Sequence, residues 1–189
     1  MLDCEDGSRI EGRSVIPNLE SGFYLEKVPE TLEELRAAAR RSDTRRRGAS
    51  MASGRMLSKK ELTERLTKKG ASPDDAAETA DWLEDLGAVD DTAYAGVIVR
   101  HYGAMGCGAA RVRQELHRRG VPKELWDEAL KQLPPPQEAI EKFLCAKLRG
   151  RPLTPEDSRR LTAALQRRGF SWQDIRPILN GLGQEIDET

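Results

Sequence analysis

The sequence predicts an all-α fold, an elongated tandem array of three three-helix repeats that follows a short β or irregular N-terminal segment. One block recurs about every fifty residues, as Leu62-x3-Leu66-x3-Gly70, Val112-x3-Leu116-x3-Gly120 and Leu161-x3-Leu165-x3-Gly169. A leucine also follows each glycine by thirteen residues, at Leu83, Leu133 and Leu182. Apolar positions held in phase over a long period are typical of stacked supersecondary units that present an extended surface.

Composition favours several small cores over one thick core. Of the 189 residues, 33% are charged and 38% are hydrophobic. The net charge of −1 conceals strong zoning, because residues 31–70 hold twelve Lys/Arg against five Asp/Glu, whereas residues 71–100 hold one Arg against eight acids. Such segregation indicates an oriented electrostatic surface, although charge runs are also common on plain solvated faces.

Residues 1–43 form the first predicted unit. Asp6-Gly7 is a candidate hairpin turn between two short mixed segments. Pro17, Gly22 and Pro29 then predict irregular chain. A helix is expected from Thr31, where Thr31-x-x-Glu34 has the pattern of a capping box.

The first repeat is predicted over residues 44–86. Its first helix, Thr44–Arg55, is rich in Arg, Gly, Ala and Ser, so we expect it to bury little and to be marginal. The second follows a capping box at Ser58–Glu61 and ends at Gly70 as a left-handed cap. The third begins at Ser72-Pro73 and ends before Gly87.

The second and third repeats are predicted over residues 87–133 and 134–189. Helices are expected from Asp90 or Asp91 to the glycine-rich 103–108 segment, and then over 109–119, 122–132 and 137–149. The third basic helix is expected to open at Thr154 and a last helix at Ser171. Pro134-Pro135-Pro136 is a stiff connector. Pro177 lies inside the last predicted helix, where proline costs about 3 kcal/mol or produces a kink.

The sequence offers no pattern of catalytic or metal-binding residues. His101 and His117 lack acids or cysteines at metal-ligand spacing, and although Cys107 lies between them, an ordinary packed or surface histidine is the more frequent case. Three scattered cysteines indicate a reducing compartment, and neither a signal peptide nor a membrane span is evident. We therefore expect a cytoplasmic protein without enzymatic activity, cofactor or membrane contact.

The candidate binding residues are cations on the second helix of each repeat. They lie off the apolar stripe, in the last turn before the glycine and about two turns earlier. Cations in a last turn also stabilise the helix dipole, so a structural role competes with a binding role. The candidates are Lys59, Lys60, Lys68 and Lys69 in the first copy, Arg111, Arg113, Arg118 and Arg119 in the second, and Arg159, Arg160, Arg167 and Arg168 in the third.

Three stretches resemble the RecX family of recombination regulators. They are Ser58–Gly70, Leu86-Gly-Ala-Val-Asp-Asp91 with Tyr94, and Gly108-Ala-Ala-Arg-Val-Arg-Gln-Glu-Leu-His-Arg-Arg-Gly-Val121. The resemblance covers about residues 45–183 and is weaker in the third copy. The sequence departs from the family pattern at Ala49–Ser53, where a leucine-rich helix is usual, and before Tyr94, where the family often has a basic residue.

The resemblance implies a non-enzymatic regulator that lies in the groove of the RecA filament on single-stranded DNA. It would restrain filament extension, ATP hydrolysis, strand exchange and LexA self-cleavage, with some direct DNA contact, and we expect a monomer. Two other classes remain open. One is a DNA-binding protein with helix-turn-helix-like repeats, which the net charge of −1 disfavours. The other is a helical scaffold for an unrelated protein.

Overall fold

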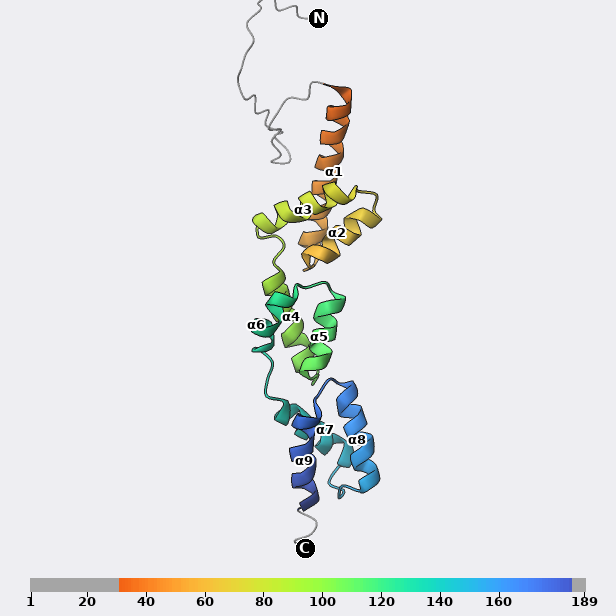
Figure 1. Cartoon of the computed structure of the whole chain (residues 1–189), viewed down its shortest axis with the longest axis vertical. Coiled ribbons are helices and arrows are strands. Elements are labelled where there is room, and N and C mark those ends of the chain that lie inside the picture. Colours follow the sequence, from red (N-terminus) through yellow and green to blue (C-terminus); the bar gives the residue numbers. More distant parts are fainter. Residues whose placement is uncertain (1–30, 185–189) are drawn as a thin grey trace, which may run out of the picture.

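The computed structural model describes residues 31–184, and all regular secondary structure in that range is helical. The helices follow one another as a long rod (Figure 1), which confirms the predicted all-α array. The Asp6-Gly7 hairpin lies outside the described residues. The elements are α1 Leu32–Gly54, α2 Lys59–Lys68, α3 Pro73–Asp85, α4 Asp91–Ala104, α5 Ala109–Arg118, the 3-10 helix η1 Lys123–Leu125, α6 Trp126–Leu130, α7 Pro136–Leu148, α8 Pro155–Arg167 and α9 Trp172–Gln184.

Buried apolar side chains gather in three separate clusters along the rod. Leu62 and Leu66 of α2 pack with α3 in the first cluster. Val112 and Leu116 of α5 pack with α4 in the second, and α8 packs with α7 and α9 in the third. Val89 lies within the predicted second repeat but packs with the first cluster. The residue bounds of the repeats therefore stay predictions. The apolar stripes of the repeated block therefore supply all three cores.

The first described helix differs from the prediction, because α1 is one continuous helix across the expected boundary at residues 43 and 44. Its alanine, glycine and serine content suits a close approach to α3. A Cβ placed on Gly48 would lie 2.7 Å from Cγ2 of Thr79, so only glycine fits there without a shift. Thr44 is also buried, and its hydroxyl donates to the carbonyl of Arg40. The small residues that were expected to bury little therefore allow α1 and α3 to pack closely.

The N-cap predicted at Ser58 and the left-handed cap predicted at Gly70 are confirmed, although the Glu61 carboxylate accepts from Tyr94 and does not complete the expected capping box; α8 has the same kinds of cap. Ser58 and Thr154 accept hydrogen bonds from the backbone N–H groups of Glu61 and Asp157. Gly70 and Gly169 follow the helices with φ of +93° and +91°. Each forms the paired bonds of a Schellman motif, which satisfy the last carbonyl groups of the helix.

Two helices depart from simple α geometry. The predicted helix over 122–132 is instead a 3-10 turn followed by the five-residue α6, and its Trp126 Nε1 donates to the carbonyl of Val121. In α9 the helix continues through Pro177, which is exposed, while Ile175 and Leu179 on the other side are buried. The bond that proline removes is therefore lost on the solvent side of the helix.

Candidate binding surface and the joints between repeats

The basic helices α2, α5 and α8 are connected end to end across the rod. We call the contact of Arg119 and Gly120, after α5, with Ser58–Glu61, at the start of α2, the first joint. We call the contact of Arg168 and Gly169, after α8, with Gly108–Arg111, at the start of α5, the second joint. In each joint the end of one basic helix meets the beginning of the preceding one, so opposite ends of two helix dipoles come together.

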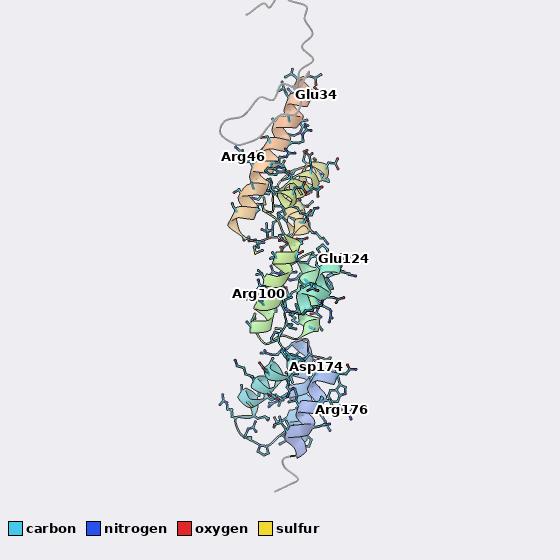
Figure 2. The ribbon with its side chains drawn as sticks, turned by 90° about the vertical axis from the view of Figure 1, so that its left-hand side faces the viewer. Glu34, Arg46, Arg100, Glu124, Asp174 and Arg176 are labelled. Carbon is cyan, nitrogen blue, oxygen red and sulfur yellow. The ribbon has the colours of Figure 1, made fainter. Side chains whose placement is uncertain are left out.

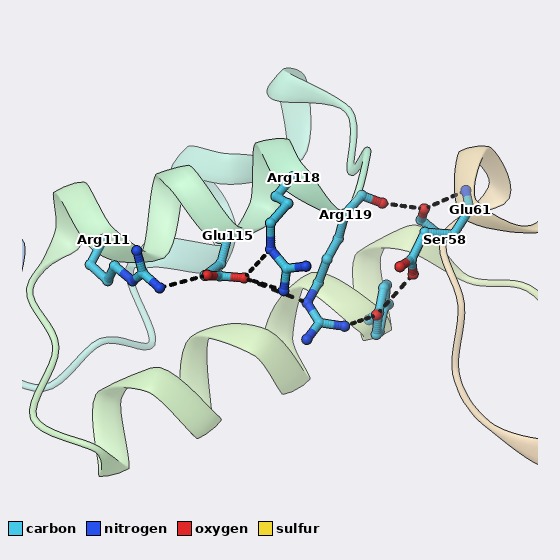
Figure 3. Close-up of polar contacts among 7 residues, drawn as sticks. Ser58, Glu61, Arg111, Glu115, Arg118 and Arg119 are labelled. Carbon is cyan, nitrogen blue, oxygen red and sulfur yellow. Dashed lines mark hydrogen bonds and ion pairs between the residues drawn. The ribbon is translucent and has the colours of Figure 1, made fainter. Parts of the chain in front are cut away.

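The first joint is built from one bond between a side-chain hydroxyl and a backbone carbonyl and from one side-chain relay (Figure 3). The Ser58 hydroxyl donates to the carbonyl of Arg119 at 2.5 Å while it accepts from Glu61 N–H at 3.0 Å. The Arg119 guanidinium donates to the Tyr94 hydroxyl at 2.7 Å, and this hydroxyl donates to a carboxylate oxygen of Glu61 at 3.1 Å. A Cβ on Gly120 would lie 2.6–3.0 Å from the stem carbons of Lys60. The stem of Lys60 thus lies directly against the glycine.

The second joint brings backbone against backbone. Gly108 N–H donates to the carbonyl of Arg168 at 2.9 Å, and Ala110 N–H donates to the carbonyl of Gly169 at 3.1 Å. A Cβ on Gly169 would lie 2.3 Å from the nitrogen of Arg111, and a Cβ on Gly108 would lie 2.4 Å from the carbonyl oxygen of Gly169. Both glycines are therefore required for this close approach.

The last cation of the pair stacks on an aromatic ring of its own repeat in both joints. The Arg119 guanidinium lies 5.9 Å from the ring centre of Tyr94 in α4, and the Arg168 guanidinium lies 4.8 Å from that of Phe143 in α7. Arg168 also donates to the carbonyl of Met105 in the preceding repeat at 3.4 Å. Such stacking holds each guanidinium over the joint.

A buried carboxylate lies beside the first joint and collects three of the predicted cations. The side chain of Glu115 is only 5% exposed, and its oxygens lie 3.0 Å from Arg111, 2.7 Å from Arg118 and 4.0 Å from Arg119. Burial by itself raises the pKa of Glu115. The hydrogen bonds from Arg118 and Tyr102 and the nearby guanidinium charges outweigh it, so the pKa is lowered from its ordinary value.

Other predicted cations also have partners inside the chain. Lys59 Nζ lies 2.7 Å from Asp81 and 2.5 Å from Glu84, and hydrogen bonds from these acids raise its pKa above the usual range. Arg160 pairs with Asp157 at 2.8 Å. Asp91, whose pKa is raised by burial, accepts a bond from the backbone N–H of Lys59.

Six of the twelve predicted cations have no ion pair or side-chain hydrogen bond with any described residue. All six are exposed and lie on the three basic helices or directly after them. We call them the outward cations: Lys60, Lys68, Lys69, Arg113, Arg159 and Arg167. They are the predicted residues whose charged groups remain available to an outside partner.

The described part of the chain contains no group of three or more His, Cys, Asp and Glu residues arranged to hold a metal ion. His117 lies edge-on to Trp126, and His101 edge-on to Tyr102.

No helix between residues 31 and 184 is long and apolar enough to cross a membrane. Trp82 and Trp126 pack against the cores, whereas Trp172 is 51% exposed.

Sequence reasoning did not identify the contacts that Ser58, Tyr94 and Glu115 make in or beside the first joint. A signal was present for one of them, because Tyr94 and Phe143 are 49 residues apart and so share the period of the repeat. Glu115 offered no such signal, since Arg65 stands at its place in the first copy and Ala164 in the third.

Comparison with known proteins gives a consistent result. Residues 90–130 match the family model described as RecX, second three-helix domain. The Regulatory protein RecX of Chromohalobacter salexigens is 34% identical over 123 residues, covering 65% of this chain and 81% of the relative. That of Mycolicibacterium smegmatis is 36% identical over 127 residues, covering 62% and 67%.

Two crystal structures share the fold. RecX from Lactobacillus salivarius matches with a TM-score of 0.67 at 20% identity, over 77% of this chain and 97% of that one. A second structure, of a regulatory protein RecX, matches with a TM-score of 0.71 at 22% identity, over 82% and 81%. The rod of helical repeats is thus an architecture already observed in crystals.

Proposed function

The chain belongs to the RecX family of regulatory proteins, and from this membership we propose that it regulates the RecA recombinase by binding in the groove of the RecA filament on single-stranded DNA. There it would bridge neighbouring RecA protomers. By doing so it would restrain filament extension, ATP hydrolysis, strand exchange and the self-cleavage of LexA. It acts by binding, as a cytoplasmic monomer.

The observation that carries this proposal is the rod itself. Three cores are joined end to end, by the Ser58 hydroxyl bond to the Arg119 carbonyl in the first joint and by backbone bonds in the second, so the outward cations are held along one extended object (Figure 1). A rod of this kind suits a long repetitive partner better than a compact one. Each basic helix of ten to thirteen residues spans about 15–20 Å by its rise, so the three in series can contact more than one protomer.

The outward cations are where we place contacts with the filament. They have no partner among the described residues, so binding need not break an existing ion pair. Arg111, Arg118 and Arg119 are less suitable, because their guanidinium groups already surround Glu115. A surface made of separate, exposed cations also gives modest affinity per contact, which accumulates over a repeated partner.

The test is single-stranded-DNA-dependent ATP hydrolysis by the cognate RecA, with the chain titrated below one copy per RecA. We expect strong suppression at these ratios, because one rod restrains several protomers. A folded chain without effect on hydrolysis contradicts the proposal. If it binds naked DNA with a steep salt dependence instead, it is a DNA-binding protein.

A further inference from the structure

We propose that Arg36, Arg40 and Arg41, on the N-terminal half of α1, form a binding site for the phosphate backbone of nucleic acid. None of them lies on the basic helices of the repeats. The site would act without RecA, so it stands or falls independently of the proposed regulation of the filament.

The first step concerns charge density. Residues 36–47 hold six arginines and one acid, Asp43, which is the most concentrated run of positive charge in the chain. Arg46 and Arg47 share Asp43 at 2.5 and 2.6 Å. Arg45 pairs with Glu78 at 2.7 Å and lies over the ring of Trp82. The second half of the run is therefore paired within the chain.

The first half of the run is not paired with any residue that the structure describes. Arg36, Arg40 and Arg41 have no ion pair with any described residue. Arg36 and Arg40 are four residues apart, so they are neighbours on one side of the helix, and like charges at this spacing repel each other. A polyanion that binds there relieves this repulsion.

The second step concerns access. No residue from Leu32 to Arg41 is buried, and the first buried residue of α1 is Thr44. Figure 1 shows this half of α1 projecting from the end of the rod, beyond α2 and α3. In Figure 2 Arg46 also extends from α1 on the side away from these helices. The phosphate backbone of a nucleic acid can therefore approach the arginines from several directions.

The third step concerns the kind of partner. A guanidinium group binds a phosphate or a carboxylate through two N–H donors, so three unpaired guanidinium groups on one helix suit a partner that carries a row of anionic groups better than a single carboxylate. A membrane surface would require a large apolar face, whereas here only Leu32 and Leu35 are exposed large apolar residues and the others are alanines. The helix has no aromatic residue on which a base could stack. The contact is therefore with the sugar-phosphate backbone of the nucleic acid, and we expect both single and double strands to bind, each with a steep salt dependence.

The experiment measures fluorescence anisotropy of labelled 30-nucleotide single-stranded and duplex DNA with the full chain, between 50 and 200 mM salt. The test variant is Arg36→Gln/Arg40→Gln/Arg41→Gln, since glutamine retains helix propensity. The matched control is Arg55→Gln/Arg151→Gln/Arg176→Gln, which removes the same charge from exposed, unpaired arginines elsewhere (Arg176 is labelled in Figure 2). Circular dichroism verifies that both variants keep their helices.

Between 50 and 200 mM salt we expect the wild-type affinity to fall about 40-fold more than that of the test variant on duplex DNA and about 20-fold more on single-stranded DNA, because three phosphate contacts are lost. The control variant should behave as wild type. Equal losses in both variants would overturn the proposal, as would absence of DNA binding by the wild type. Binding of the wild type to phosphatidylserine vesicles, lost in the test variant while DNA binding persists, would assign the arginines to a membrane surface and also overturn it.

Discussion

The ends of α2 and α8 share one local structure and differ in what lies beside them. Gly70 and Gly169 have nearly the same φ, +93° and +91°, and the same pair of capping bonds. A Cβ on Gly70 would meet no atom within 4 Å, whereas one on Gly169 would lie 2.3 Å from the backbone of Arg111. The same sequence element is thus a helix cap at the end of the rod and a cap combined with a joint inside it.

This difference changes how the repeated cationic pair is understood. The threefold repetition favoured a binding face or a duplicated cap, but Arg119 and Arg168 instead stack over the joints. Lys69, at the equivalent place in the first copy, meets no preceding repeat within residues 31–184. Its carbonyl accepts from Arg47 of α1 at 3.2 Å instead. A cationic pair that recurs in every repeat can therefore serve to connect neighbouring repeats as well as to form a binding surface.

The largest effect is expected from the two glycines. Gly70→Ala lowers the free energy of unfolding by about 1–2 kcal/mol, because alanine is strained in the left-handed conformation. Gly169→Ala has the same strain and also forces the second joint apart, which lowers the free energy of unfolding by about 1–3 kcal/mol more. Urea denaturation measures the free energy of unfolding, and small-angle scattering measures the length of the rod. Equal losses of stability and an unchanged rod in both variants would show that the second joint is not a close contact.

The next effect concerns Glu115. Glu115→Gln removes the charge that holds Arg111 and Arg118, and because these partners are half-exposed we expect a cost of about 1–3 kcal/mol at pH 7. Its pKa is lower in the folded chain than in the unfolded one. Its stabilising contribution is therefore complete above the ordinary glutamate pKa of about 4.3 and is lost as the pH falls toward the lower folded value.

Denaturation of wild type and Glu115→Gln across pH 3–7 measures this contribution directly. The difference in unfolding free energy between the two should be constant above pH 5 and shrink in acid. A difference that stays constant down to pH 3 would mean that the arginines do not stabilise the carboxylate.

A smaller effect is expected from two serine caps. Ser58 and Ser72 each accept a bond from the third residue of their helix, but only Ser58 is buried and also donates across the first joint to Arg119. Both alanine variants lose a cap worth about 1 kcal/mol, and Ser58→Ala loses about 1 kcal/mol more with the buried bond. Thermal or urea denaturation of the two variants compares them. Equal destabilisation of the two variants would show that the bond from Ser58 to Arg119 does not contribute to stability.

The fold could be predicted from the sequence because its signals are local. The apolar stripes, the serine and threonine caps and the glycine stops each depend on residues within one or two turns, and they give most helix boundaries within a few residues. The single helix α1 could not be predicted in this way. Its small residues are favourable only because Thr79 and Leu83 of α3 lie against Gly48, which is a contact between distant segments.

The candidate site was predicted only in its composition. Sequence alone identified the twelve cations, but it could not separate those with partners from those without. That separation depends on acids brought close by folding, such as Asp81 and Glu84 beside Lys59. The joints were not predicted either, because a glycine needed for a cap and a glycine needed for close approach have the same sequence pattern.

The most direct test of the division between paired and outward cations measures, by cosedimentation, how wild type and one variant bind to RecA filaments on single-stranded DNA. The outward variant is Arg113→Glu/Arg159→Glu/Arg167→Glu, whose residues have no ionic partner among those described, so its stability should stay within about 0.5 kcal/mol of wild type. If the outward cations contact the filament, this variant loses binding while its helix content is unchanged. Full retention of binding by the folded variant would contradict the account and place the interface on another face of the rod.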